Sequence, residues 1–271
     1  MTMNWTDIIE RRKSVRTFSR ETPLAPRQLN AVTEAVAGAN AASHGLFACT
    51  WAEADADNRT FRPSTYGIIK DAAGFIPVAF DLSDTTAALA VGRCLERLVL
   101  ELTMAGVSTC WLGGTFRASS FRAVLETEPP RQISIVIAVG IAACRKRLIE
   151  RLTSALAGSH TRKPFDSLFT TADGTPLPPD SPWRKPLEAM RLAPSSLNCQ
   201  PWRAIIAGDK AHFFVRAKSR DNYVDMGIGL AHVALSAIDH DLRLCETTDD
   251  SPAILCPTAQ YVCSATLQLP E

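Results

Sequence analysis

Apolar residues recur every three or four positions along several segments, which is the spacing expected of helices that bury one face. The strongest pattern covers residues 85–105, where apolar side chains surround most of the helix (Leu89, Cys94, Leu95, Leu98, Val99, Leu102 and Met104). A helix that is apolar on most sides belongs in a core. Gly106 follows it as a stop signal. Shorter patterns predict helices over residues 7–13, from residue 26 onward, over 183–192 and over 224–239.

Two of these helices have recognisable starts. Thr6 is the expected N-cap of the first helix, because a threonine hydroxyl can accept a free backbone N–H. Pro26 suits the first turn of the second helix. Residues 38–64 are small, polar and irregular, and they predict a loop.

Uninterrupted apolar runs predict strands. Residues 132–139 read Gln-Ile-Ser-Ile-Val-Ile-Ala-Val, which is typical of a buried strand. Residues 202–207 and 211–215 predict a hairpin, because the Gly-Asp-Lys sequence between them favours a tight turn. Two more strands are expected over residues 75–80 and 260–267.

The order of these elements is nearly repeated. A helix, a helix, a strand, a buried helix and a strand are followed by a helix, a hairpin, a buried helix and a strand. The intervening stretch, 145–182, is rich in Pro, Asp, Gly and Thr and is the expected linker. This order indicates a diverged internal duplication, in which two similar halves face each other and the two buried helices lie at their shared centre.

Composition narrows the class of protein. A chain of 271 residues is near the upper limit for one core, so one large domain and two coupled domains both remain open. Apolar residues make up 46% and charged residues 21%, as in a folded globular protein. A net charge of +1 provides no global field for nucleic acid or an anionic membrane. The N-terminus does not resemble a secretory signal, and charges interrupt the longest apolar stretch, so we expect neither nucleic-acid nor membrane partners.

Cysteine and histidine patterns argue against a metal site. None of the eight cysteines forms a Cys-x-x-Cys pair, so we interpret them as reduced, buried thiols of a cytoplasmic protein. The five histidines form no ligand pattern. We expect His232 to be a hydrogen-bonded helix residue, whereas His160 could face either solvent or a bound phosphate near Arg162. The sequence also lacks a Gly-x-Gly-x-x-Gly loop, a P-loop and a Gly-x-Ser-x-Gly elbow.

Two segments carry candidate chemistry. Residues 11–18 read Arg-Arg-Lys-Ser-Val-Arg-Thr-Phe and place cations and a hydroxyl at the end of a helix. Such a cluster suits a phosphate, because guanidinium groups pair with two oxygens at once. Residues 193–202 read Ala-Pro-Ser-Ser-Leu-Asn-Cys-Gln-Pro-Trp and offer amide donors and acceptors that suit the edge of a heterocycle. Taken separately, the first could be a solvated basic face and the second a self-capping turn.

Together the segments resemble the two signature motifs of the FMN-dependent nitroreductase family, Arg-x-Ser-x-Arg and Pro-Ser-Ser-x-Asn-x-Gln-Pro-Trp. In ordinary members of that family the first motif precedes the second by a few dozen residues, and motifs from two subunits meet at one flavin. Here the motifs lie in opposite halves of one chain. The sequence is therefore similar to a subgroup whose members are single-chain pseudo-dimers.

The resemblance implies an α+β, nitroreductase-like fold with central antiparallel sheets and long core helices. It implies an N-terminal half of residues 1–165 and a C-terminal half of residues 166–271, which share one FMN site. Further segments that resemble the subgroup are residues 66–72, 111–114, 139–140, 162–164 and 225–232. The cofactor-binding residues implied by the resemblance are Arg12, Lys13, Ser14, Arg16, Leu112, Gly113, Gly114, Arg162, Pro194, Ser195, Ser196, Asn198 and Gln200.

A second flavin site would need the same motifs in the opposite order. The matching region of the first half, residues 39–46, lacks the Gln-Pro-Trp ending, and no Arg-x-Ser-x-Arg occurs near 160–190. We therefore expect one working site, one eroded site and a monomeric protein.

The resemblance also implies an activity. NAD(P)H would deliver hydride to the flavin and leave, and a nitroaromatic, quinone or similar small-molecule acceptor would then take the electrons. The flavin carries that chemistry, so no side chain is expected to be catalytic and no metal is required. Three alternatives remain open: a flavin-binding protein without turnover, a flavin-dependent dehydrogenase of a biosynthetic intermediate, and a module that binds no flavin.

Overall fold

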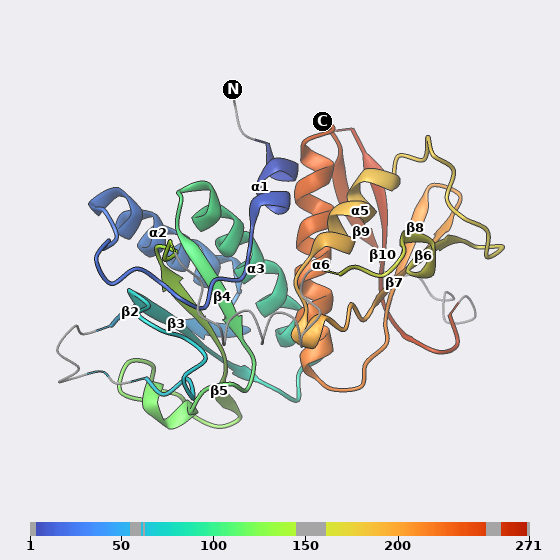
Figure 1. Cartoon of the computed structure of the whole chain (residues 1–271). Helices are drawn as coiled ribbons and strands as arrows, with labels where there is room; N and C mark the ends of the chain where they lie inside the picture. Colours follow the sequence, from blue (N-terminus) through green and yellow to red (C-terminus); the bar gives the residue numbers. More distant parts are fainter. Residues whose placement is uncertain (1–3, 55–60, 62, 145–160, 248–255, 270–271) are drawn as a thin grey trace.

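The computed structural model describes residues 4–54, 61, 63–144, 161–247 and 256–269, and the expectation for His160 lies outside these ranges. Figure 1 shows one sheet at each side of the molecule, with long helices between them. Both sheets have five strands. The strands of the first are β1 (Phe47–Cys49), β2 (Ala52–Glu53), β3 (Gly74–Asp81), β4 (Ser108–Leu112) and β5 (Arg131–Gly140). Those of the second are β6 (Phe169–Thr171), β7 (Trp202–Ala207), β8 (Lys210–Val215), β9 (Arg243–Thr247) and β10 (Gln260–Gln268).

The first sheet has the order β1-β3-β5-β4, and β2 also pairs with β3. All of these pairs are antiparallel. The second sheet has the order β6-β7-β8-β10-β9. Its pairs are antiparallel except for the parallel pair of β6 with β7. The predicted hairpin is formed by β7 and β8, and the predicted buried strand is β5, whose residues are buried from Ile135 to Gly140.

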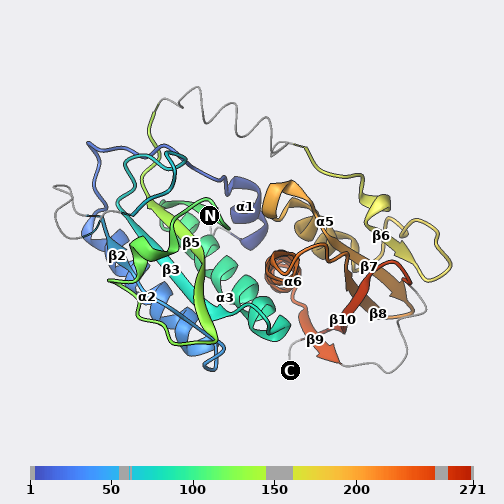
Figure 2. The same ribbon diagram turned by 90° about the horizontal axis from the view of Figure 1, so that it is seen from below.

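The described α-helices are α1 (Trp5–Arg11), α2 (Pro26–Ala42), α3 (Thr85–Met104), α5 (Arg184–Leu192) and α6 (Asp221–Ile238). Short 3₁₀ turns are η1 (Ala118–Phe121), η2 (Phe165–Ser167) and η3 (Ser196–Asn198). Figure 2 shows α3 and α6, the two predicted core helices, side by side between the sheets. None of the helices in the described ranges has the length and apolar character needed to cross a bilayer.

Helix α3 crosses α6 at a point where each helix has a glycine. A Cβ atom placed on Gly92 would lie 2.1 Å from the carbonyl oxygen of Val224, and one placed on Gly227 would lie 2.2 Å from that of Leu89. These separations are shorter than any van der Waals contact. Only glycine therefore lets the two backbones touch at this crossing.

The first helix begins differently from the prediction. Thr6 lies inside α1, and the N-cap is Asn4, whose side chain accepts a hydrogen bond from the backbone N–H of Asp7 at 2.8 Å. The carboxylate of Asp239, just after α6, accepts from the backbone N–H groups of Trp5 and Thr6 at 2.9 and 2.6 Å. The start of the helix thus has a local cap at Asn4 and a second, distant acceptor at Asp239.

The prediction of a loop over 38–64 is wrong in part. Helix α2 continues to Ala42, and β1 and β2 pair with β3. The extension is rich in alanine, which favours helix despite Gly38. Asn40 then ties the helix to β1, because its side chain donates to the carbonyl of Cys49 and accepts from the backbone N–H of the same residue at 2.8 and 2.9 Å.

The cysteines are less buried than predicted. All eight lie in the described ranges and form no disulfide, yet only Cys49, Cys110 and Cys263 are buried, and Cys144 is exposed. Burial raises the pKa of Cys49 and Cys263 to about 12. These two thiols are therefore poor nucleophiles.

Candidate cofactor site

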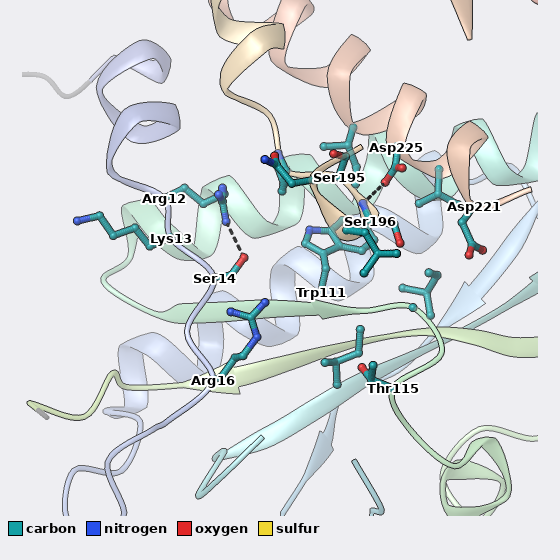
Figure 3. A pocket seen from close by; sticks show the side chains of 18 of the residues that line it. Arg12, Lys13, Ser14, Arg16, Trp111, Thr115, Ser195, Ser196, Asp221 and Asp225 are labelled. Atoms are coloured by element: carbon teal, nitrogen blue, oxygen red, sulfur yellow. Dashed lines mark hydrogen bonds between the residues drawn. The ribbon is translucent and has the colours of Figure 1, made fainter. Parts of the chain in front are cut away.

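A cavity of about 820 Å³ lies where the two sides of the molecule meet. Its walls come from the segment after α1, from the end of β4, from the turn after α5 and from the start of α6 (Figure 3). The volume is within the range of small-molecule and cofactor sites. Its apolar wall residues are Ile68, Trp111, Leu112, Ile135, Leu192, Pro194, Leu197, Val224 and Ile228.

Eleven of the thirteen residues proposed from the sequence line this cavity. From the N-terminal side they are Arg12, Lys13, Ser14, Arg16, Leu112 and Gly113. From the C-terminal side they are Arg162, Pro194, Ser195, Ser196 and Asn198. The two signature segments, far apart in the sequence, therefore face one space.

The segment after α1 is held along the first sheet. The backbone N–H of Val15 donates to the carbonyl of Thr109 in β4, and the backbone N–H of Phe18 donates to the carbonyl of Lys70, both at 2.9 Å. In such an extended segment alternate side chains point to the same side. This backbone pairing places Arg12, Ser14 and Arg16 at the cavity (Figure 3).

Two guanidinium groups share one end of the cavity. The side chain of Arg12 is only 8% exposed, and its Nη1 lies 3.5 Å from the hydroxyl of Ser14. Arg162 donates to the carbonyl of Leu192 at 3.0 Å and to Oδ1 of Asn198 at 3.3 Å. Burial lowers the pKa of Arg162, and the positive charges of Arg12 and Arg191 lower it further. An anion between these groups would relieve their repulsion.

The turn after α5 has an unusual backbone. Leu197, Asn198 and Gln200 all have positive φ angles, of 49°, 53° and 46°. This conformation is sparsely populated by residues other than glycine and is often found where a loop shapes a ligand site. Leu197 is 85% exposed at the cavity.

Internal hydrogen bonds maintain this turn. Ser195 Oγ accepts from the backbone N–H of Gln200 at 3.0 Å. Asp225 Oδ1, from α6, accepts from the backbone N–H of Ser196 at 2.8 Å (Figure 3). Burial raises the pKa of Asp225 to about 6, and the hydrogen bonds from Ser196, Cys199 and Asn222 oppose that rise. Burial and the neighbouring Asp225 raise the pKa of Cys199 to about 12, so this thiol is not an activated nucleophile.

Two of the sequence candidates do not line the cavity. Gln200 is 2% exposed, and its amide accepts from the backbone N–H of Lys163 at 2.9 Å and donates to the carbonyl of Asn198 at 3.1 Å. Its polar atoms therefore stabilise the turn through these hydrogen bonds. Gly114 has a φ of +89° and follows the lining residue Gly113 in the chain.

Other lining residues were not proposed from the sequence. Trp111, Ile68, Val224, Asp225 and Ile228 lie in or next to segments that resemble the family, so a signal for them existed. The rest are Glu10, Thr115, Ile135, Leu192, Leu197 and Asp221. Four of them lie in or next to the segments already singled out, and Leu197 is the variable position of the second motif. Ile135 and Asp221 come from β5 and α6, and no spacing in the sequence reveals that they reach the cavity.

The family model described as "Putative TM nitroreductase" matches residues 4–237. This chain belongs to that nitroreductase family. The match covers most of the chain and includes both motifs at the cavity. The recognition made from the two motifs is therefore confirmed. A search of curated proteins found no match.

Among solved structures, the fold of this chain is similar to that of a nitroreductase. A "putative nitroreductase" from Thermotoga maritima has 19% sequence identity and a TM-score of 0.59, and the alignment covers 98% of this chain and 94% of that chain. This likeness confirms the predicted nitroreductase-like α+β fold. A Bacteroides fragilis nitroreductase with bound FMN has 18% identity and a TM-score of 0.40 over 54% of this chain and 92% of that one. A Desulfitobacterium hafniense nitroreductase with bound FMN has 19% identity and the same TM-score, over 54% and 93%.

Proposed function

We propose that the cavity binds one FMN and that the protein is a flavin-dependent oxidoreductase, which takes hydride from NAD(P)H and reduces nitroaromatics, quinones or similar acceptors. One observation carries the proposal. The basic segment of residues 12–16 and the turn of residues 194–198 line a single cavity of cofactor size, although they lie in opposite halves of the chain.

The cavity's residues fit the parts of FMN. Arg12, Ser14 and Arg162 would hold the phosphate, because two partly buried guanidinium groups and a hydroxyl form a good anion site. The apolar walls, including Trp111 and Ile228, would bury the ring. Ser195, Ser196 and Asn198 offer groups for the ribityl chain or the ring edge. Gln200 would act indirectly by keeping the turn in shape.

The chemistry would be the cofactor's. FMN, when bound, accepts a hydride and passes electrons to a second molecule. The protein's own residues would bind and orient. Arg16 and Lys13 add positive charge at the cavity, which favours anionic groups there. The apolar walls would exclude water and admit a flat donor or acceptor in turn.

We also propose that the chain acts as a cytoplasmic monomer whose two sheets mark two nitroreductase-like halves. Arg162 and Lys163 bond to Leu192, Asn198, Cys199 and Gln200 in the second half. This favours a boundary before residue 161 rather than at the predicted 165. Light scattering should give the mass of one chain.

The first test is the visible spectrum of the purified protein with flavin counted per chain. We expect the flavin bands and one FMN per chain. Two FMN per chain would contradict the eroded second site, and a colourless protein that stays colourless after FMN addition would overturn the proposal. A flavin-loaded protein that fails to oxidise NAD(P)H would be a flavin-binding protein without turnover. Substrate-dependent flavin reduction without NAD(P)H would indicate a dehydrogenase.

The second test uses one variant from each side of the cavity. Arg12→Ala and Asn198→Ala should each raise the Kd for FMN, by roughly 10- to 100-fold and about tenfold, because each removes a polar partner from a buried site. Arg27→Ala and Asn30→Ala, at exposed positions of α2, are matched controls that should leave the Kd unchanged. Titration by fluorescence measures all four. Unchanged FMN affinity in either cavity variant would contradict a shared site.

A further inference from the structure

The carboxylate of Glu96, in the middle of α3, is fully buried at the centre of the molecule. Its Oε2 accepts a hydrogen bond from the indole Nε1 of Trp111 at 2.8 Å. Its Oε1 lies 2.9 Å from Nε2 of His232 and 3.9 Å from Nε of Arg12. These neighbours come from β4, α6 and the segment after α1. A buried carboxylate is unfavourable unless donors surround it, so this cluster needs a reason beyond packing.

His232 holds the carboxylate in place. This side chain is also fully buried, and its Nδ1 lies 2.9 Å from the carbonyl oxygen of Ala189 in α5. A carbonyl oxygen only accepts, so Nδ1 carries a hydrogen. A second proton must then lie between Nε2 of His232 and Oε1 of Glu96, because two acceptors would repel at this distance. Helices α3, α5 and α6 are thereby tied together, and Oε2 is left to receive Trp111.

The cluster reaches the cavity through Trp111. Its ring is the one aromatic group among the described residues that line the cavity, and in Figure 3 it lies below Ser196. Pairing of β4 with β5 fixes the backbone of Trp111 but not the rotation of its ring about the side-chain bonds. The hydrogen bond from Nε1 to Glu96 selects one orientation. A tryptophan fixed in this way offers a large, rigid surface to a planar ligand.

We propose that Glu96 is a positioning residue for the cavity, and that it fixes the indole plane of Trp111 against a planar aromatic ligand. Arg12 is the second cavity residue at the same carboxylate. At 3.9 Å its Nε is farther from Glu96 than either hydrogen-bonded donor, and its Nη1 lies 3.5 Å from the hydroxyl of Ser14 at the cavity. The inference rests on the proposed function, in which that ligand is the flavin ring.

Two substitutions of Glu96 separate its role from general packing. In Glu96→Gln the amide oxygen can still accept from Trp111, while the amide N–H group faces His232. Glu96→Leu keeps a similar volume but removes the acceptor. Riboflavin, which lacks the phosphate, reports the ring site alone. We expect Glu96→Leu to weaken the binding of riboflavin and of FMN about tenfold, and Glu96→Gln to weaken it by less than about threefold.

A double-mutant cycle tests whether the effect passes through Trp111. In a Trp111→Phe background, Glu96→Leu should cause no further loss of riboflavin affinity. Glu101→Leu, on the same helix but at a half-exposed position that pairs with Arg97, is the matched control and should leave riboflavin affinity unchanged. Equal losses of affinity in the two backgrounds would overturn the proposal.

A readout without flavin keeps the inference separate from the proposed function. The indole N–H signal of Trp111 in an NMR spectrum can be assigned by its disappearance in Trp111→Phe. In the flavin-free chain we expect this signal to shift and to lose protection from hydrogen exchange in Glu96→Leu, but to persist in Glu96→Gln. An unmoved signal in Glu96→Leu would overturn the positioning role, whereas absence of riboflavin and FMN binding in the unaltered chain would overturn the proposed function.

Discussion

Asp225 combines burial, a structural hydrogen bond and a place in the cavity wall. It is 3% exposed and accepts from the backbone N–H of Ser196. Its pKa of about 6 in the folded protein lies above the ordinary 3.8. The folded state therefore holds a proton on Asp225 between these two pH values that the unfolded chain has already released. Stability from this group falls as the pH rises from about 4 to 6 and is constant above that range.

This behaviour gives a prediction for Asp225→Asn. The free energy of unfolding of the unaltered protein, relative to that of the variant, should fall by up to about 3 kcal/mol between pH 4 and pH 6. Urea unfolding at several pH values measures the difference, and Asp180→Asn, at an exposed position away from the cavity, is the control. A difference that does not vary with pH would show that Asp225 titrates as it does in the unfolded chain.

At the scale of an element, α1 illustrates how a helix can depend on a residue far away in the sequence. The backbone N–H groups of Trp5 and Thr6 donate to the carboxylate of Asp239, and the hydroxyl of Thr6 donates to the same carboxylate at 2.7 Å. Because α1 leads directly into Arg12 and Ser14, this contact also fixes where the basic segment enters the cavity. The helix is a support of the site as well as of the fold.

Asp239→Ala should lower the free energy of unfolding by about 1–2 kcal/mol, because it leaves helix N–H groups and a hydroxyl without their acceptor. It should also raise the Kd for FMN, although residue 239 does not line the cavity. Chemical denaturation and flavin titration check the two effects. Glu34→Ala, at an exposed position of α2, should produce neither. A variant of unchanged stability with weakened FMN binding, or a less stable variant with unchanged FMN binding, would show that Asp239 serves only one of the two roles.

Elements with a strong local pattern were predictable from the sequence. Helix α3, strand β5 and the hairpin of β7 and β8 follow from apolar periodicity and turn residues alone. Strands β1, β2, β6 and β9 span five residues or fewer, and they exist because a neighbouring strand supplies their hydrogen bonds. Helix α6 begins at Asp221, three residues before its predicted start. Its first turn contains the buried polar residue Asn222, which interrupts the apolar pattern.

The candidate site was predictable where residue types were distinctive. Arginines, serines and an asparagine in two short motifs pointed to residues that line one cavity. Gln200 was misplaced because a sequence cannot tell whether an amide faces a ligand or its own turn. Glu96 and His232 could not be joined beforehand, since their contact depends on how α3 and α6 cross.

At the scale of the whole molecule, that crossing decides the arrangement of the two sheets. Gly92 and Gly227 let the backbones of α3 and α6 touch. Helix α6 carries the cavity residues Val224, Asp225 and Ile228, and α3 carries Glu96. Any separation of the helices therefore moves the α6 wall of the cavity relative to Glu96 and to Trp111, which is hydrogen-bonded to Glu96.

Gly227→Ala should lower the free energy of unfolding by about 1–3 kcal/mol, because the added methyl group meets the backbone of α3 and cannot be accommodated by a side-chain rotation. Gly38→Ala is the matched helix substitution. No atom lies within 4 Å of its added Cβ, so it should stabilise the protein by about 0.5–1 kcal/mol. Thermal and urea unfolding compare the two variants. Similar shifts of the same sign would contradict backbone contact at the crossing.

Because Arg12 and Asn198 belong to one polypeptide, the space between them is formed in every folded molecule, however dilute the protein. A site shared by two identical subunits is lost when the subunits dissociate, and each substitution then occurs in both subunits. Here each wall can change without imposing the same change on the opposite wall. A single chain can thus keep the basic wall constant while the turn of residues 194–198 adapts to a new ligand.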